Sequence, residues 1–153
     1  MNNILDIVRA AARQTPDAQA LVCGPASLTY RILACRVHAL ANALCSLGIP
    51  TGARIAIFLD KRIETVISML GAAAAQCVFV PINPLLKPQQ VAHVLRDCSA
   101  DCLITTALRA RVLDENGVAG VHHTIIVDDP SAVSRHLRMQ THIHTWPEPA
   151  CVG

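Results

Sequence analysis

The sequence predicts an α/β fold, a doubly wound and mostly parallel β-sheet with helices on both faces. Between residues 29 and 127, segments with apolar residues at helical spacing alternate with short apolar runs of strand length. The short runs, such as CVFV and CLIT, are almost continuously apolar and do not alternate with polar residues. Strands of a parallel sheet that is covered on both faces have this composition.

The elements follow one another in a regular order along the chain. Apolar residues three and four positions apart predict helices, and short runs rich in Ile, Val and Phe predict strands. The predicted helices cover residues 3–13, 30–47, 63–74, 88–98 and 107–113, and the predicted strands cover 20–23, 27–28, 54–58, 77–80, 102–105 and 124–127.

Polar and helix-breaking residues set the boundaries of these elements. Asn2 or Asn3 is suited to cap the first helix, and Thr29 to cap the second. Gly48 follows the second helix and ends it, whereas Pro88 fits the first turn of a later helix. The periodicity fades after Pro130. We therefore expect residues 1–129 to form one subdomain and residues 130–153 to form an irregular tail.

One uncharged stretch, residues 66–86, has about the length of a membrane-spanning helix. However, its centre is Gly71 followed by four alanines, which are only weakly hydrophobic, and Pro81 and Pro84 lie near its end. The apolar stripe also begins earlier, beside charged residues at 61, 62 and 64. An amphipathic helix followed by a buried strand explains the pattern better, so we expect no membrane span.

Composition excludes several classes of partner and location. The formal net charge is only +2 and the arginines are scattered, which argues against nucleic-acid binding. The N-terminal residues do not fit a secretory signal peptide. Most of the seven cysteines lie in apolar stretches, so we expect all of them to be reduced in a cytoplasmic protein.

Two groups of residues have the chemistry of metal ligands. Cys98 and Cys102 are separated by three residues, but we interpret both as structural because no second cysteine pair follows. The pairs His122–His123 and His142–His144 could coordinate a metal if the chain folded them together, although such pairs are usually solvated. We therefore assign no metal ligand from the sequence.

No catalytic residue can be assigned from the motifs that are present. The sequence lacks G-x-S-x-G, G-x-x-x-x-G-K-[ST] and G-x-G-x-x-G, so neither a nucleophile elbow nor a phosphate cradle is visible. The acidic residues Asp60, Glu64 and Asp97 are expected on solvated helix faces or at helix caps.

Four segments in order resemble the AMP-forming acyl-adenylate family of acyl-CoA synthetases, adenylation domains and luciferases. These segments are LTYRIL (28–33), LGIPTGARIAIFL (47–59), AAAQCVFVPINPLL (73–86) and PQQVAHVLRDCSADCLIT (88–105). The stretch TPDAQALV (15–22) also matches how these proteins begin, so the resemblance covers about residues 4–128. Within these segments, the sequence INPLLKPQQVAHVLRDC resembles that of acyl-CoA ligases, and in particular that of the exosortase-associated branch.

The resemblance implies a known reaction and an incomplete fold. The family uses ATP to convert a carboxylate to an acyl-AMP, and a thiol such as coenzyme A then captures the acyl group. Its phosphate loop, ribose-binding acidic residue and catalytic lysine all lie beyond the matched segment. The resemblance therefore implies an incomplete N-terminal subdomain, which contributes Asn83 at most to the wall of an acyl pocket.

Two residues depart from the pattern of the family. Ala53 stands where the family usually has Asp, and Gln76 stands where it usually has Gly, between a helix and a strand. A glycine there would permit a left-handed helix end, whereas Gln in that conformation costs on the order of 1 kcal/mol. These departures put the activity of this chain in doubt.

The sequence leaves three functions open. The leading one is the N-terminal portion of an AMP-forming acyl-CoA ligase that uses ATP, Mg²⁺, coenzyme A and a carboxylic or fatty acid when complete. We expect this portion to bind none of these cofactors alone and to be inactive. The second is a non-catalytic interaction module that self-associates through an exposed apolar sheet surface. The third is a metal or redox protein that uses Cys98, Cys102 and the histidines of the tail.

Overall fold

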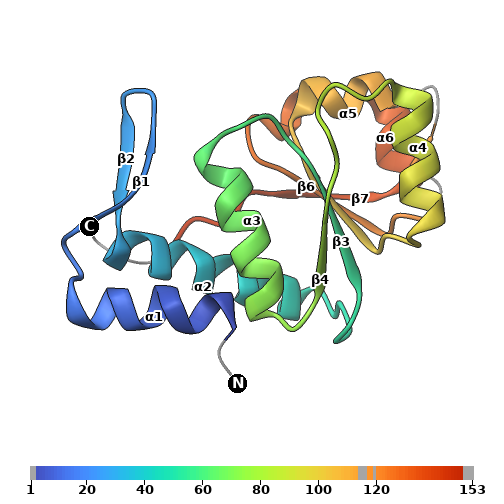
Figure 1. The fold of residues 1–153 in the computed structure, drawn as a ribbon. Coiled ribbons are helices and arrows are strands. Elements are labelled where there is room, and N and C mark those ends of the chain that lie inside the picture. The colour runs from blue at the N-terminus through green and yellow to red at the C-terminus, as the bar shows by residue number, and fades with distance from the viewer. Residues whose placement is uncertain (1–2, 114–116, 119, 150–153) are drawn as a thin grey trace.

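Five parallel strands form the centre of the fold in the computed structural model, which describes residues 3–113, 117–118 and 120–149 (Figure 1). From one edge to the other they are β4 (Val78–Pro81), β3 (Arg54–Phe58), β5 (Cys102–Thr105), β6 (His123–Ile126) and β7 (His142–Thr145). Each neighbouring pair is parallel and in continuous register. The predicted parallel sheet is confirmed.

Helices cover both faces of this sheet (Figure 1). One face carries α1 (Ile4–Gln14), α2 (Tyr30–Ser46) and α3 (Ile63–Ala74), and the other carries α4 (Pro88–Asp97), α5 (Ala107–Leu113), a 3₁₀ turn η1 (Pro130–Ala132) and α6 (Arg135–Gln140). Alternate residues of β3 serve the two cores: Ile57 packs toward α2 and α3, and Phe58 packs toward α4 and α5. This double burial explains why the strands read as continuous apolar runs.

A small hairpin precedes the sheet and leads into the second helix. Its strands, β1 (Gln19–Cys23) and β2 (Ala26–Thr29), pair antiparallel across a turn at Gly24-Pro25. The hydroxyl oxygen of Thr29 then accepts a hydrogen bond from the backbone N–H of Ile32, at 3.3 Å, and caps α2. At the start of α1, Asn3 accepts hydrogen bonds from Leu5 and Asp6 in the same way.

The helices α2 and α3 approach each other closely because Gly71 has no side chain. A Cβ atom added at Gly71 would lie 2.6 Å from a terminal methyl carbon of Leu40, which is fully buried on α2. The small residues after Leu70 in α3 therefore serve a packing purpose. The same residues made the stretch 66–86 look weakly hydrophobic, and the structure divides that stretch between α3 and β4. No helix in the described part of the chain is long and apolar enough to cross a membrane.

The predicted irregular tail is wrong over residues 130–145. This segment forms η1, α6 and β7, and β7 adds a fifth strand to the sheet. Three apolar residues hold it: Val133 and Leu137 are buried in the core beside α5, and Ile143 packs against the same core. A six-residue helix and an edge strand with the sequence HIHT give almost no periodic apolar signal, which explains the error.

The prediction that every cysteine is reduced is wrong for Cys35, which is disulfide-bonded. Cys35 lies half-buried on α2. A cysteine that only fills space in the core as a small apolar residue would be fully buried. Five other cysteines are free, and Cys151 lies outside the described residues.

Gln76 adopts the left-handed conformation that its position in the sequence predicts. Its φ is +60°, and it immediately follows the last turn of α3. The backbone N–H of Cys77 donates to the carbonyl of Ala72 at 2.9 Å, which closes the helix end, while the carbonyl of Gln76 accepts from Gly52 at 2.8 Å. Gln76 is therefore held in an unfavourable backbone conformation between α3 and β4.

We predict that Gln76→Gly stabilises the fold by about 0.5 kcal/mol. Glycine removes a left-handed strain on the order of 1 kcal/mol, and the greater freedom of the unfolded chain offsets part of this gain. Urea denaturation followed by circular dichroism measures the change. Ala75→Gly is the matched control, because φ at Ala75 is −81° and no strain is relieved there. A Gln76→Gly variant that is no more stable than Ala75→Gly would contradict this account.

Candidate functional site

The order of the strands identifies the edge of the sheet at which a ligand would bind. From β3 the chain first adds β4 on one side and then crosses to add β5 on the other. The connections on the two sides therefore separate at the carboxyl end of β3. In open α/β sheets a crevice forms at this point and is the usual place for a ligand.

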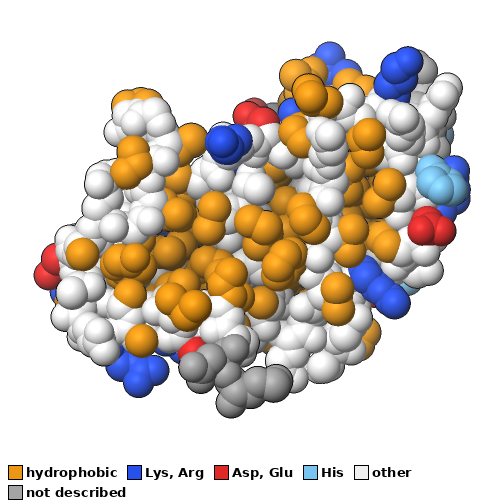
Figure 2. Space-filling view, viewed as in Figure 1, with side chains coloured by type: hydrophobic (Ala, Val, Ile, Leu, Met, Phe, Trp, Pro, Cys, Tyr) orange, Lys and Arg blue, Asp and Glu red, His pale blue; other side chains and the backbone are white. Residues whose placement is uncertain are grey.

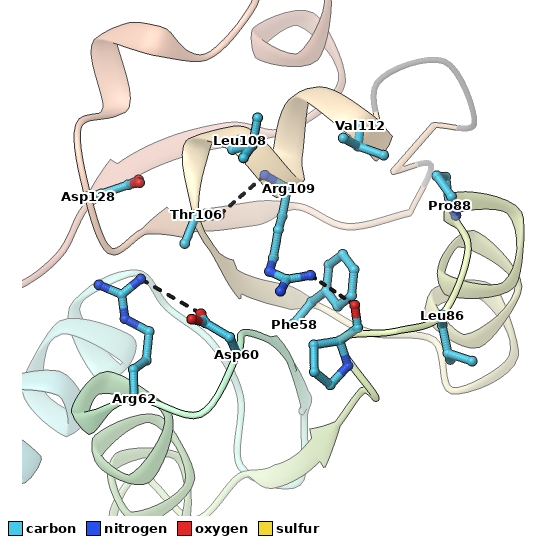
Figure 3. Close-up of a pocket in the computed structure, with 11 residues that line it drawn as sticks. Phe58, Asp60, Arg62, Leu86, Pro88, Thr106, Leu108, Arg109, Val112 and Asp128 are labelled. Carbon is cyan, nitrogen blue, oxygen red and sulfur yellow. Dashed lines mark hydrogen bonds and ion pairs between the residues drawn. The ribbon is translucent and has the colours of Figure 1, made fainter. Parts of the chain in front are cut away.

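A cavity of about 530 Å³ occupies this position (Figure 3). Its lining residues lie at or just after the carboxyl ends of β3, β5 and β6, on α5, and in the loop that leads into α4. Its lining comprises Phe58, Asp60, Arg62, Pro84, Leu86, Pro88, Thr106, Leu108, Arg109, Val112 and Asp128. Charged groups and apolar side chains therefore meet in one hollow.

Arg109 crosses the cavity from α5 and ties two loops together (Figure 3). Its guanidinium carbon lies 4.9 Å from the ring centroid of Phe58, a cation–π distance, and its Nη1 donates to the carbonyl of Pro84 at 3.1 Å. The side chain thus connects α5 with the end of β3 and with the loop between β4 and α4.

Hydrogen bonds at the ends of β5 and β6 fix the backbone beneath Arg109. The buried hydroxyl of Thr105 donates to the carbonyl of Phe58 at 2.8 Å, joining β5 to β3 at their last paired residues. The hydroxyl oxygen of Thr106 accepts from the N–H of Arg109 at 3.2 Å, as an N-cap residue does. Asp128, which follows β6, accepts from the N–H of Ala107 at 2.8 Å. The floor of the cavity is therefore preorganised.

The connection between β3 and α3 supplies the opposite wall. Nη1 of Arg62 lies 3.9 Å from a carboxylate oxygen of Asp60 (Figure 3). Its Nε lies 3.0 Å from a carboxylate oxygen of Glu64. Asp60 and Glu64 were expected on solvated surfaces or at helix caps, but both interact with Arg62. These ion pairs are local in the sequence, whereas the position of Asp60 and Arg62 in the wall of a cavity follows from the strand order.

Asn83, the predicted acyl-pocket residue, lies at the mouth of a second, more apolar cavity of about 520 Å³. Asp60, Arg62 and Pro84 border both cavities. Asn83 is exposed, and its side-chain oxygen accepts from the N–H of Leu85 at 2.9 Å, which shapes the loop after β4. Its contact with an acyl group remains a prediction.

The two cysteines considered as metal ligands point to opposite faces of the sheet. Cys102 is fully buried in the core beneath α2 and α3, whereas Cys98 packs against the core beneath α4 and α5. Burial raises the pKa of the Cys102 thiol far above its usual range, so this group stays protonated. The interpretation of both residues as structural agrees with this geometry.

The lining of the main cavity lacks several reactive side-chain types. None of its lining residues is Ser, Cys or His, so the described lining contains no nucleophile activated by a base. It also contains no glycine, and its arginines are already engaged by Pro84 and Glu64. The described lining of this cavity therefore forms no glycine-rich cradle for phosphates.

Comparison with known proteins places the chain in a family. The AMP-binding enzyme family matches residues 8–150, and the chain belongs to it. The phosphinothricin tripeptide synthetase PhsB of Streptomyces viridochromogenes is 35% identical over 127 residues, which is 82% of this chain and 10% of that synthetase. The resemblance found in the sequence is thus confirmed at the level of the family.

Solved structures agree on the part of the enzyme that is present. The N-terminal subdomain of NpsA from Klebsiella oxytoca, in complex with anthranilyl-AMSN, is 31% identical with a TM-score of 0.62, over 66% of this chain and 26% of that one. The anthranilate CoA ligase AuaEII, in complex with anthranoyl-AMP, shares the fold at 24% identity with a TM-score of 0.79, over 91% of this chain and 28% of that one. The chain thus spans about a quarter of each of these two structures.

We predict that Arg109→Ala lowers the free energy of unfolding by about 1–3 kcal/mol. The variant loses a charge-assisted hydrogen bond to Pro84 and a cation–π contact with Phe58. Thermal or urea denaturation measures this loss. Arg111→Ala on the same helix is the control, since Arg111 is exposed and its removal should cost little. Equal stability of the two variants would show that Arg109 does not tie the loops together.

Proposed function

We propose that the chain is the N-terminal subdomain of an ATP-dependent, AMP-forming acyl-CoA ligase of the cytoplasm. The observation that carries the proposal is the family match over residues 8–150. The sequence INPLLKPQQVAHVLRDC, which resembles that of acyl-CoA ligases, supports the finer assignment. In the complete enzyme this subdomain supports the acyl pocket, with Asn83 at its wall, while ATP, Mg²⁺ and coenzyme A bind groups that other parts of the enzyme supply.

A second function has support of its own. PhsB, which is 35% identical to this chain, is a tripeptide synthetase. The complete enzyme would then adenylate an amino acid and not a fatty or aryl acid. The two candidates share the first half-reaction and differ in the acid and in the thiol that receives it.

The sequence of the gene beyond codon 153 tests membership in a larger enzyme. We expect a Ser/Thr/Gly-rich phosphate loop within the next coding segment, and its absence in every frame would overturn the proposal. With the complete enzyme, AMP formation that requires coenzyme A and a fatty or aryl acid would support the acyl-CoA ligase. AMP formation that requires an amino acid but not coenzyme A would favour the peptide synthetase.

We predict that residues 1–153 alone catalyse no ATP–pyrophosphate exchange with a panel of fatty, aryl and amino acids. The reason is the lack of a phosphate cradle and of an activated nucleophile in the described cavity. Radiolabelled pyrophosphate incorporation into ATP is the measurement. AuaEII with anthranilate, assayed in parallel, is the positive control. Acid-dependent exchange above the protein-free background would refute the inactivity of the chain.

The apolar surface of the sheet is proposed to cause self-association of the isolated chain. Figure 2 shows hydrophobic side chains gathered in the middle of one face, over α3 and the elements beside it. Val78 lies 51% exposed on β4, an edge strand whose outer side has no partner among the described strands. Apolar edge strands of this kind promote association between copies.

We predict that Val78→Lys reduces this association. A lysine on an edge strand opposes pairing with a second chain because it would bury a charge. Multi-angle light scattering over a range of concentrations measures the mean mass. Val112→Lys is the matched control, since Val112 is 49% exposed but lies on α5, away from β4. A native chain that stays monomeric at all concentrations would contradict the prediction.

A further inference from the structure

Three histidines lie on one face of the sheet at its β6–β7 edge. His123 is directly opposite His142 in the parallel register, and His144 lies two residues further along β7. Residues two apart on a strand share a face, and this is the face on which Ile125 packs toward the core of α2 and α3. The topology therefore brings His123 close to His142 and His144, which lie 19 and 21 positions later in the sequence.

Two of these rings approach within bonding distance. Nδ1 of His123 lies 3.0 Å from Nε2 of His144, and the ring centroids are 5.2 Å apart. In the absence of another atom, one nitrogen must carry a proton and donate it to the other. Both side chains are only half-buried, so a solute can reach them.

We propose that His123 and His144 form a two-ligand chelate for a borderline divalent transition-metal ion, Cu²⁺ in preference to Ni²⁺. Imidazole suits both ions, and each accepts two nitrogens at about 90° in tetragonal coordination. With metal–nitrogen bonds of about 2.0–2.1 Å, two such nitrogens lie about 2.9 Å apart, close to the observed separation. A tetrahedral ion such as Zn²⁺ would require a wider separation, of about 3.3 Å.

The surroundings of the pair suit a metal ion with solvent ligands. No group of three His, Cys, Asp or Glu side chains in the described part of the chain is arranged to hold a metal, so water completes the coordination. The titratable groups nearby are His142, whose ring centroid is 5.8 Å from that of His123, and His122, whose Nδ1 is 3.7 Å from a carboxylate oxygen of Asp101.

The chain contains its own optical reporter for the experiment. Trp146 is the single tryptophan and lies two residues beyond His144. Untagged protein is titrated with CuCl₂ at pH 7.5, and quenching of the indole emission gives the affinity. Pulsed electron paramagnetic resonance on the native chain then counts the imidazoles bound to Cu²⁺. MgCl₂ is the negative control, because Mg²⁺ prefers oxygen ligands to imidazole.

We expect Cu²⁺ to quench Trp146 with saturation and to bind two imidazoles. His123→Gln and His144→Gln should each weaken the binding by roughly tenfold or more. His93→Gln is the matched control, since His93 is exposed on α4, across the sheet. Circular dichroism checks the fold of each variant. The number of imidazoles bound to Cu²⁺ is measured on the native chain, so this part of the test does not depend on whether a variant folds.

Two results would overturn the proposal. One is that His144→Gln and His93→Gln bind Cu²⁺ with equal affinity. The other is a resonance spectrum with a single imidazole or none. In either case the 3.0 Å contact is only a hydrogen bond between two neutral rings.

Discussion

The fold depends on the burial of β3 from Ile55 to Phe58. This strand is paired on both sides, to β4 and to β5, and is packed on both faces, with Ile55 and Ile57 on one and Ala56 on the other, all at most 1% exposed. A strand in this position has no solvent-facing side, so every polar backbone group must be paired within the sheet. The helices are then constrained to lie in two layers, because each layer must cover one side of the same strand.

The constraint on β3 also explains where the candidate site lies and what limits it. Because the chain leaves the carboxyl end of β3 in one direction and later returns on its other side, the loops at that end diverge and leave a hollow. The side chains in the hollow hold the loops: Arg109 joins Phe58 and Pro84, and Arg62 joins Asp60 and Glu64. Such an arrangement provides a shaped surface that is held in place by its own side chains.

Features that depend on adjacent residues were predictable from the sequence. Thr29 caps its helix, Pro88 begins one, and Gln76 takes the left-handed conformation, each as local chemistry requires. Features that depend on distant residues were not. The sequence could not reveal that β7 pairs with β6, that Cys35 is disulfide-bonded, or that Arg109 meets Phe58, since each joins segments whose distance apart only the topology sets. The histidine pairs are an intermediate case. The sequence identifies them as candidate ligands, but the distance between His123 and His144 depends on how β6 and β7 pair.

The strand order has a consequence for how the protein can be built during its synthesis. Once β3 and β4 have paired through α3, each later strand joins an edge that is still free: β5 beside β3, then β6 beside β5, then β7 beside β6. No strand has to be inserted between two that are already paired. The sheet can therefore grow in the order in which the chain leaves the ribosome, at a rate of roughly 5–20 residues per second. A larger enzyme that begins with this subdomain would have a folded platform ready before its remaining parts were made.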